Sequence, residues 1–245
     1  MTKQAALGAQ LLVAGINVSN DIREVSMGSP HGVFPSTGID KGAMERMLGR
    51  KDGRIAVTTF FNPAAGRAHD VFSALPRTDV IGTFQHAQAV GSAAASLQAK
   101  QLNHDGDRPA DGQLFFAVEM LANGFPLEWG NNLTAGSDVL TGAAAGTGFD
   151  TAASASFGLQ AYLHVLAFTG TSATVTIQDN TTDTPGTYAD VTGAGFVAAT
   201  AVGAQRIQTS RTQTVRRWIR YNVTGTFSAL TLAVLVTKNE GTVNF

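Results

Sequence analysis

Three apolar runs recur between residues 54 and 130: RIAVTTFF (54–61), DVIGTFQH (79–86) and QLFFAVEMLA (113–122). Each run combines β-branched and aromatic residues over a length that is typical of a strand. In the last run apolar side chains occupy both alternating sets of positions and only Glu119 interrupts them, so we expect both faces of that strand to be buried. The stretch therefore predicts a compact β-sandwich with residues 113–122 as a central strand.

One helix is predicted between the first two of these strands. Asn62 is a favourable N-cap, and Pro63 suits the first helical position, where a backbone N–H has no partner to lose. Alanine and larger apolar residues continue at helical spacing as far as Leu75, and Pro76 ends the segment. We expect this helix to plug the sandwich.

The composition favours a mostly β protein of one large or two small domains. The chain has 245 residues, of which 44% are hydrophobic, 14% are charged and 27 are glycines. It contains no cysteine, which excludes a disulfide framework and Cys-ligated metal and fits assembly in a reducing cytoplasm. No apolar run approaches the ~20 residues of a membrane span, and Met1 to Gln10 lack signal-peptide features. We expect a soluble protein without a membrane partner.

The charge is close to neutral in both parts of the chain. Residues 1–150 carry 11 basic and 14 acidic side chains, and residues 151–245 carry 6 and 4. A protein that grips phosphates needs a basic surface, so this balance argues against tight binding of nucleic acid.

The chain is expected to open with a hairpin of residues 11–18 and 22–27, followed by a long inserted loop from Gly28 to Gly53. Within the loop we predict a short helix, Lys41 to Leu48, capped by Asp40 and closed by Gly49. Connections of this length are uncommon unless they are functional. The loop is therefore either a solvated surface segment or a docking element for a neighbouring subunit. Its candidate docking residues are Asp40, Lys41, Glu45, Arg46, Arg50, Lys51 and Asp52.

Residues 93–102 predict a strand with one dry and one wet face. Ala95, Leu97 and Ala99 alternate with the polar side chains of the other face, which are Ser96, Gln98 and Lys100. The wet face either lies on a free surface or lines an aqueous channel built by several subunits. In the second case Ser96, Gln98 and Lys100 are the candidates that face the channel.

After Trp129 the composition changes abruptly. Residues 131–155 consist largely of Gly, Ala, Ser, Thr, Asn and Asp, which predicts a linker between a first domain (1–130) and a second one (156–245). Beyond the linker, short alternating strands are expected at 159–168, 174–178, 205–209, 215–223 and 230–237. Turns are expected at Thr169-Gly170, at 179–186 and at Gly225. This pattern predicts a small outer β-sandwich of jelly-roll or immunoglobulin-like type.

Motifs for catalysis or cofactors are missing from the sequence. The five histidines do not have the spacing of a metal site. No Gly-x-Ser-x-Gly motif supplies a nucleophile that could work with His69-Asp70. Pro109 takes the place of an oxygen ligand in the calcium-like loop 103–112. Gly146-Thr-Gly148 lacks the third glycine of a dinucleotide site. We predict no catalytic residue, cofactor or metal.

One aromatic group flanked by cations remains as a possible contact site. Arg216, Trp218 and Arg220 are expected on one face of a strand, where a tryptophan between arginines can hold a sugar or a nucleobase. The same pattern also arises when arginine stems simply cover an indole ring.

Several short motifs occur in an order that resembles a known family. They are TGIDKGAMER (37–46), RKDG (50–53), FFNP (60–63), ALPRTD (74–79), AKQ (99–101) and NGFPLEWG (123–130). The sequence resembles the major tail protein, or tail tube protein, of long-tailed (siphovirus-type) bacteriophages, especially phages of actinobacteria. The resemblance covers residues of about 10 to 150, and the rest resembles the extra outer sandwich that some of these proteins carry.

This resemblance implies a structural virion protein rather than an enzyme. Its fold would be a tail-tube β-sandwich that forms a barrel with other copies, and six subunits would form each ring. Stacked rings would form the tube through which duplex DNA passes without tight binding. The implied partners are other copies of the chain, a tape-measure protein and a tail-terminator protein, in a tail assembled in the host cytoplasm. The alternative is a carbohydrate-binding or adhesin protein that contacts host-surface glycans through its C-terminal sandwich.

Overall fold

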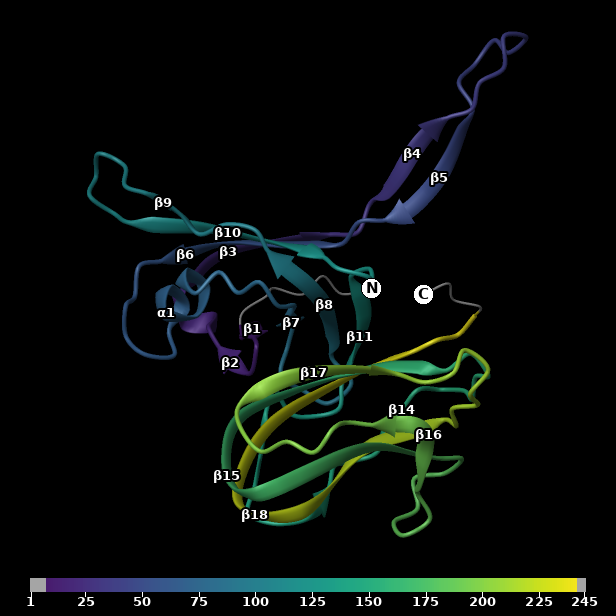
Figure 1. Ribbon diagram of the computed structural model, residues 1–245. Helices are drawn as coiled ribbons and strands as arrows, with labels where there is room; N and C mark the ends of the chain where they lie inside the picture. The colour runs from purple at the N-terminus through teal and green to yellow at the C-terminus, as the bar shows by residue number, and fades with distance from the viewer. Residues whose placement is uncertain (1–7, 242–245) are drawn as a thin grey trace.

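The computed structural model describes residues 8–241 and shows a mainly β protein with one α-helix (Figure 1). The predicted fold class is thereby confirmed. The strands form one hydrogen-bonded network folded into two lobes, together with a separate two-stranded hairpin. No helix within residues 8–241 is long and apolar enough to cross a membrane. The signal-peptide expectation concerned residues 1–10, of which residues 1–7 lie outside the described part.

The first lobe is a curled antiparallel sheet around one core. Its strands pair in the order β1, β7, β8, β10, β6, β3, and β2 and β9 pair at the margins. Their bounds are β1 (Gln10–Val13), β2 (Ile16–Asn17), β3 (Ile22–Gly28), β6 (Arg54–Phe60), β7 (Val80–Gln85), β8 (Ala93–Gln101), β9 (Asp105–Asp107) and β10 (Phe115–Ala122). The four strands expected between residues 54 and 122 are confirmed, and β10 lies between two neighbours as expected.

The burial of β10 differs from the expectation. Val118 and Met120 are buried in the core of the first lobe, but Ala117 is exposed and Glu119 and Leu121 are only half-buried. The expectation of two buried faces was wrong because the curled sheet covers this part of β10 on its inner side only.

The helix is shorter than predicted. Helix α1 (Ala68–Ser73) begins five residues after Pro63, and Asn62 does not cap it. Gly66 adopts a left-handed φ of 70°, which is incompatible with helix at that point. The capping group comes instead from Asp21, a buried residue of the 3-10 helix η1 (Ser19–Asp21), whose carboxylate accepts a hydrogen bond of 3.1 Å from the Ala68 N–H.

Asp21 collects its partners from across this lobe. Arg67 and Asn62 donate to its carboxylate at 2.8 and 2.9 Å. Burial alone would raise the pKa of Asp21, but the hydrogen bonds from Asn62, Ala68 and Arg67 hold it below its usual value. The start of the helix is therefore fixed by a residue more than forty positions away, which local sequence does not reveal.

The opening hairpin also forms differently. Strand β1 turns back at Ala14 and Gly15 to pair with β2, and β3 pairs with β6 rather than with β1. Gly15 takes a left-handed φ of 85°, and Ala14 one of 50°. The predicted pairing of 11–18 with 22–27 was wrong because this tight turn lies inside the segment taken as one strand.

Two long strands organise the second lobe. Strands β15 (Leu159–Asn180) and β18 (Trp218–Lys238) pair along their whole length and bend sharply together (Figure 1). The register shifts at 165/167, 169/170 and 170/172, and Gly225 has a φ of 128° where its backbone approaches Ser172. The turns expected at Thr169-Gly170 and Gly225 were wrong, since both positions are bends within continuous strands.

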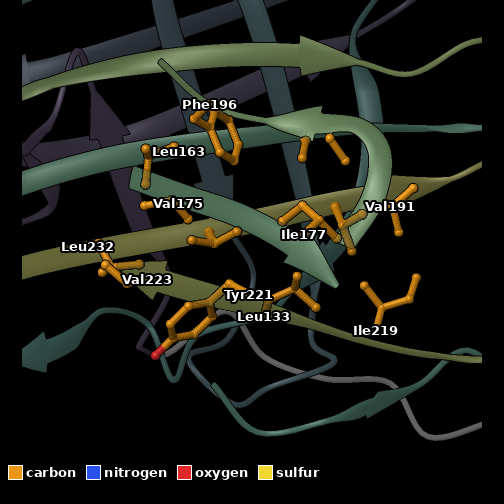
Figure 2. Close-up of a cluster of buried hydrophobic side chains, with 14 of the residues drawn as sticks. Leu133, Leu163, Val175, Ile177, Val191, Phe196, Ile219, Tyr221, Val223 and Leu232 are labelled. Carbon is orange, nitrogen blue, oxygen red and sulfur yellow. The ribbon is translucent and has the colours of Figure 1, made fainter. Parts of the chain in front are cut away.

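The bend folds the ribbon into a sandwich that encloses its own core. Figure 2 shows Leu163, Val175, Val223 and Leu232 meeting from the two halves of β15 and β18. Strands β16 (Ala189–Gly195) and β17 (Gly203–Gln208) pair with opposite ends of β15. The expected strand at 205–209 matches β17, whereas β16 was missed because its sequence, ADVTGAG, carries little apolar signal.

Residues 131–155 are paired with the second lobe. Strands β12 (Asp138–Leu140), β13 (Ala144–Ala145) and β14 (Phe149–Asp150) all hydrogen-bond to β18. Leu133 is fully buried in the second core, and Tyr221 donates to Asp138 at 2.6 Å. The segment predicted as a linker is therefore paired with β18, because short backbone ladders hold this Gly- and Ala-rich segment where few side chains can. The domain boundaries remain predictions.

Strand β11 (Glu128–Asn132) joins the two lobes, since it pairs with β8 on one side and with β18 on the other. Beside it a buried polar cluster bridges the lobes. Arg206 donates to Glu128 at 2.7 Å and to Tyr162 at 3.1 Å, and its guanidinium lies 3.6 Å from the centre of the Phe125 ring. Burial opposes the charge of Arg206, but the bonds to Glu128 raise its pKa, whereas burial and Glu128 raise that of Tyr162.

A second polar contact between the lobes centres on His164. The Gly15 N–H donates to its Nδ1 at 3.3 Å, so the neutral ring carries its proton on Nε2, which lies 2.9 Å from the Thr83 hydroxyl. Thr83 is in turn 3.0 Å from Ser96. Complete burial lowers the pKa of His164 to about 3.

The burial of neutral His164 predicts a specific acid sensitivity. Because its pKa is about 3 in the folded chain and 6.5 in its ordinary state, the unfolded chain binds more protons between these values. Above about pH 6.5 His164 should not make the free energy of unfolding depend on pH. Between about pH 6.5 and pH 3 it should lower this free energy as the pH falls, by at most ~1.4 kcal/mol per pH unit. Urea unfolding of the wild type and of His164→Gln over this range measures it, because glutamine does not titrate.

The exposed His31 provides the control. His31→Gln should retain the pH dependence of the wild type, whereas His164→Gln should show a shallower one on a lower overall stability. Equal slopes for His164→Gln and wild type would contradict the assignment of a buried neutral imidazole.

Candidate functional site

A hairpin that is exposed along nearly its whole length projects away from both lobes (Figure 1). We call it the arm. It consists of β4 (His31–Pro35), β5 (Arg46–Lys51) and the loop between them, and it forms its own two-stranded sheet. The predicted helix at 41–48 was wrong: Glu45 bonds back to Thr37, and β5 pairs with β4, so Asp40 caps no helix.

The arm exposes large apolar side chains on both of its faces. Phe34 pairs with Met47 across the strands and Val33 with Leu48, so successive pairs point to opposite sides. Phe34 is 57% exposed and Leu48 is 68% exposed. An isolated two-stranded hairpin is marginally stable in water, and apolar exposure of this kind is typical of a surface that a partner covers.

The candidate docking residues all lie on or beside the arm. Lys41 and Glu45 pair with each other at 3.7 Å, and Arg46 donates toward the Met44 sulfur. Within residues 8–241 no carboxylate lies within ion-pair distance of Arg50 or Lys51. Strand β5 therefore carries two cations without an ion-pair partner in the described residues, and Asp40 and Asp52 lie outside that strand.

A second hairpin, formed by β9 and β10, extends from the same layer (Figure 1). Residues 105–113, which comprise β9 and most of the loop after it, are exposed and carry Asp105, Asp107 and Asp111 with a single arginine, Arg108, and we call this segment the acidic loop. It overlaps residues 103–112, the loop whose sequence resembles a calcium-binding loop. Within residues 8–241 no three or more His, Asp or Glu side chains are placed so that they could hold one metal ion.

Aromatic rings gather at the base of that hairpin. His104 stacks on Phe116 at 4.3 Å between ring centres, and His69 lies 5.1 Å from His104 and 4.8 Å from Phe61. We call Phe61, His69, His104 and Phe116 the aromatic patch. His69 Nδ1 and His104 Nε2 have no hydrogen-bond partner within the described residues, and burial, then the neighbouring His69, lowers the pKa of His104.

The aromatic patch was not anticipated from the sequence. Its rings come from four separate places in the chain that span 55 residues from Phe61 to Phe116, and the predicted helix that contains His69 began too early. The one available signal was the repetition of FF at 60–61 and 115–116. The first pair lies where β6 finishes and the second where its neighbour β10 begins, so the two pairs lie side by side.

The expected channel-facing residues occupy different environments. Ser96 is buried and bonded to Thr83 beneath the second lobe, so its expected position on a wet face was wrong. Gln98 and Lys100 are half-buried and both contact Asp79, at 2.8 Å each. The Lys100 bond and the amide of Gln98 hold the pKa of Asp79 below its usual value against a smaller effect of burial. Whether Gln98 and Lys100 face a channel stays a prediction.

The arginines and tryptophan of the second lobe do not converge on one site. Arg216 binds the buried Asp179 at 2.7 Å, and Arg220 binds Gln178 and lies over the Tyr188 ring. The cation beside Trp218 is Arg217, at 5.9 Å from the ring centre. Arg216 and Arg220 each already have a partner, and whether they form a contact site with Trp218 stays a prediction.

Comparisons with known proteins give weak structural likenesses and no sequence family. No protein-family model and no curated protein matches the sequence. A chain of the virion of a native gene transfer agent particle matches with a TM-score of 0.39 and 12% identity, covering 51% of this chain and 98% of that one.

Two phage structures match over a larger share of the chain. They are the SPP1 Dit protein (gp 19.1), a hub of the adsorption apparatus of phages that infect Gram-positive bacteria, and a chain of the phage p2 baseplate in its activated conformation with Sr. Their TM-scores are 0.33 and 0.34, with 11% and 12% identity over 94% and 95% of this chain and 99% of each of theirs. These solved structures are all parts of phage or phage-like particles, but likenesses this weak assign the chain neither a family nor a function.

Proposed function

We propose that this protein is a structural subunit of a bacteriophage tail, which assembles with copies of itself into stacked, hexameric rings that form the tail tube. The observation that carries the proposal is the arm, which projects from the two lobes and exposes apolar side chains on both of its faces. Such a hairpin gains stability only when another chain covers it. The short motifs that resemble tail tube proteins, among them TGIDKGAMER in the arm, also support a role as a tail subunit.

Ring formation also suits the open sheet edge. Strand β3 pairs with β6 on one side only in the described residues, and Arg23 and Glu24 on it are exposed. Charged side chains guard an edge against indiscriminate pairing, whereas closure of a ring covers edges altogether. In this proposal the tape-measure and tail-terminator proteins are further partners, and the protein acts in the virion without enzymatic activity.

Duplex DNA would pass through the tube without tight binding. The first lobe contributes more acidic than basic residues, and Lys100, one of the proposed channel residues, already binds Asp79. A conduit without free cations releases few counterions on contact with DNA, so affinity stays low.

Electron microscopy of the purified full-length protein tests the function. We expect rings or tubes at high protein concentration, and no measurable affinity of these tubes for duplex DNA at physiological salt by fluorescence titration. A protein that stays monomeric at all concentrations would contradict the proposal. Tubes that bind DNA tightly and in a salt-sensitive way would contradict the conduit role alone.

A further inference from the structure

We infer that the arm of one copy binds the acidic loop and the aromatic patch of the next copy. This inference rests on the proposed self-assembly and names the surface that receives the arm. Neither the arm nor this receiving surface has a partner of its own within the described chain, and the two are complementary in three respects.

The first respect is their position at opposite ends of one layer. The arm leaves the sheet beside Gly28 and Arg54, which are paired at one end of β3 and β6. The acidic loop and the aromatic patch lie at the other end, where Phe60 pairs with Phe115 and Phe115 with Asp107. The seven residues of β6 separate the two ends by about 20 Å, so an arm pointing outward cannot reach the patch of its own chain.

A contact between unlike surfaces at opposite ends repeats from copy to copy. Such head-to-tail contacts generate rings when the rotation closes and filaments when it does not. Both outcomes use each arm and each receiving surface once, which leaves neither exposed inside an assembly.

The second respect is apolar surface. The arm offers Phe34, Met47, Val33 and Leu48, and the receiving end offers Phe61, which is 43% exposed, beside the half-buried rings of His69, His104 and Phe116. Aromatic and methionine side chains are enriched in the buried centres of protein interfaces. Contact between them removes from water the large apolar groups that the single chain leaves exposed.

The third respect is charge. Strand β5 carries Arg46, Arg50 and Lys51, whereas the exposed strand β9 carries Asp105 and Asp107, and the loop after it carries Asp111 and one arginine. No ion pair within residues 8–241 neutralises either set. Opposite charges around an apolar centre orient the two partners and suppress wrong pairings.

Reversal of these charges tests the contact. In one variant Arg46, Arg50 and Lys51 become glutamate, and in the other Asp105, Asp107 and Asp111 become lysine. Each variant alone should associate at least about tenfold more weakly than wild type in sedimentation experiments, because like charges then face each other. Mixed in equal amounts, the two should assemble again, since each arm then meets a receiving loop of opposite charge. Circular dichroism checks that both variants are folded.

Matched controls separate this contact from general effects of charge and hydrophobicity. Arg77→Glu, which reverses one exposed charge that belongs to neither surface, should assemble like wild type. Phe34→Ser with Met47→Ser should weaken assembly, whereas serine at Val139, which is 71% exposed on the second lobe, should not.

The outcomes distinguish the inference from the function on which it rests. If wild type assembles and the two reversed variants assemble equally well, the docking surface is wrong and the tail function stands. If each variant fails alone and the mixture also fails, the two surfaces do not contact each other. If wild type itself never associates, both the function and this contact are overturned.

Discussion

Replacing Arg206 by alanine should lower the free energy of unfolding by about 3–5 kcal/mol. The Arg206 side chain is 3% exposed and that of Glu128 is 7% exposed, so the substitution leaves a carboxylate buried between the lobes without its cation. Tyr162 alone would remain to donate to Glu128, at 2.5 Å. Urea denaturation followed by tryptophan fluorescence measures the change, since Trp129 adjoins Glu128 in β11.

An exposed ion pair supplies the control for this prediction. Arg217 binds Asp150 at 2.6 Å in a contact that water reaches, so Arg217→Ala should cost much less. Replacing both Arg206 and Glu128 by methionine should recover much of the loss, because neither charge then remains buried. If Arg206→Ala is no more costly than Arg217→Ala, the cluster does not hold the lobes together.

Much of the first lobe could be predicted from local pattern. Strands β6, β7, β8 and β10 combine apolar alternation with turn residues at their ends, and the observed bounds differ from the expected ones by no more than two residues. These strands pack around a single core, so the alternating apolar positions of the sequence are the positions that the fold buries. The same rule fails for the outer face of β10, where Ala117 is apolar but uncovered.

The errors occur where distant residues decide the local structure. Residues 41–48 have a cap and a closing glycine for a helix, but residues 46–48 pair with β4 and the Glu45 N–H donates to Thr37 instead. Likewise α1 starts where its first N–H, that of Ala68, can donate to Asp21. Propensity is a weak prior in both cases because tertiary hydrogen bonds override it.

The junction between the lobes was hidden for a different reason. Its key residues, Glu128, Tyr162, His164 and Arg206, are polar side chains of a kind that single-sequence reasoning places on the surface. In β15 the segment LQAYLHVL alternates as expected for one wet face, yet both faces are buried, one in the second core and the other against the first lobe. Only the mutual satisfaction of these groups in space makes their burial possible.

The close approach of the lobes predicts a large effect from the smallest possible substitution. Gly15 has a φ of 85°, and a Cβ atom at this position would lie 2.6 Å from the carbonyl oxygens of both Val165 and Gly203. Gly15→Ala should therefore cost about 1–2 kcal/mol for the left-handed backbone and about 1–3 kcal/mol more for overpacking. It should also displace the Gly15 N–H that donates to His164. Thermal and urea unfolding measure the combined loss.

Gly124 separates the two contributions, because it has nearly the same φ, 84°, and nothing within 4 Å of its added Cβ. Gly124→Ala should show the backbone cost alone, so the difference between the two variants reports the contact between the lobes. Both variants remove the same glycine flexibility from the unfolded chain, which cancels in the comparison. Equal destabilisation by the two substitutions would mean that the contact at the β1–β2 turn adds nothing to the free energy of unfolding. The second lobe would then not stabilise, through this turn, the sheet from which the arm projects.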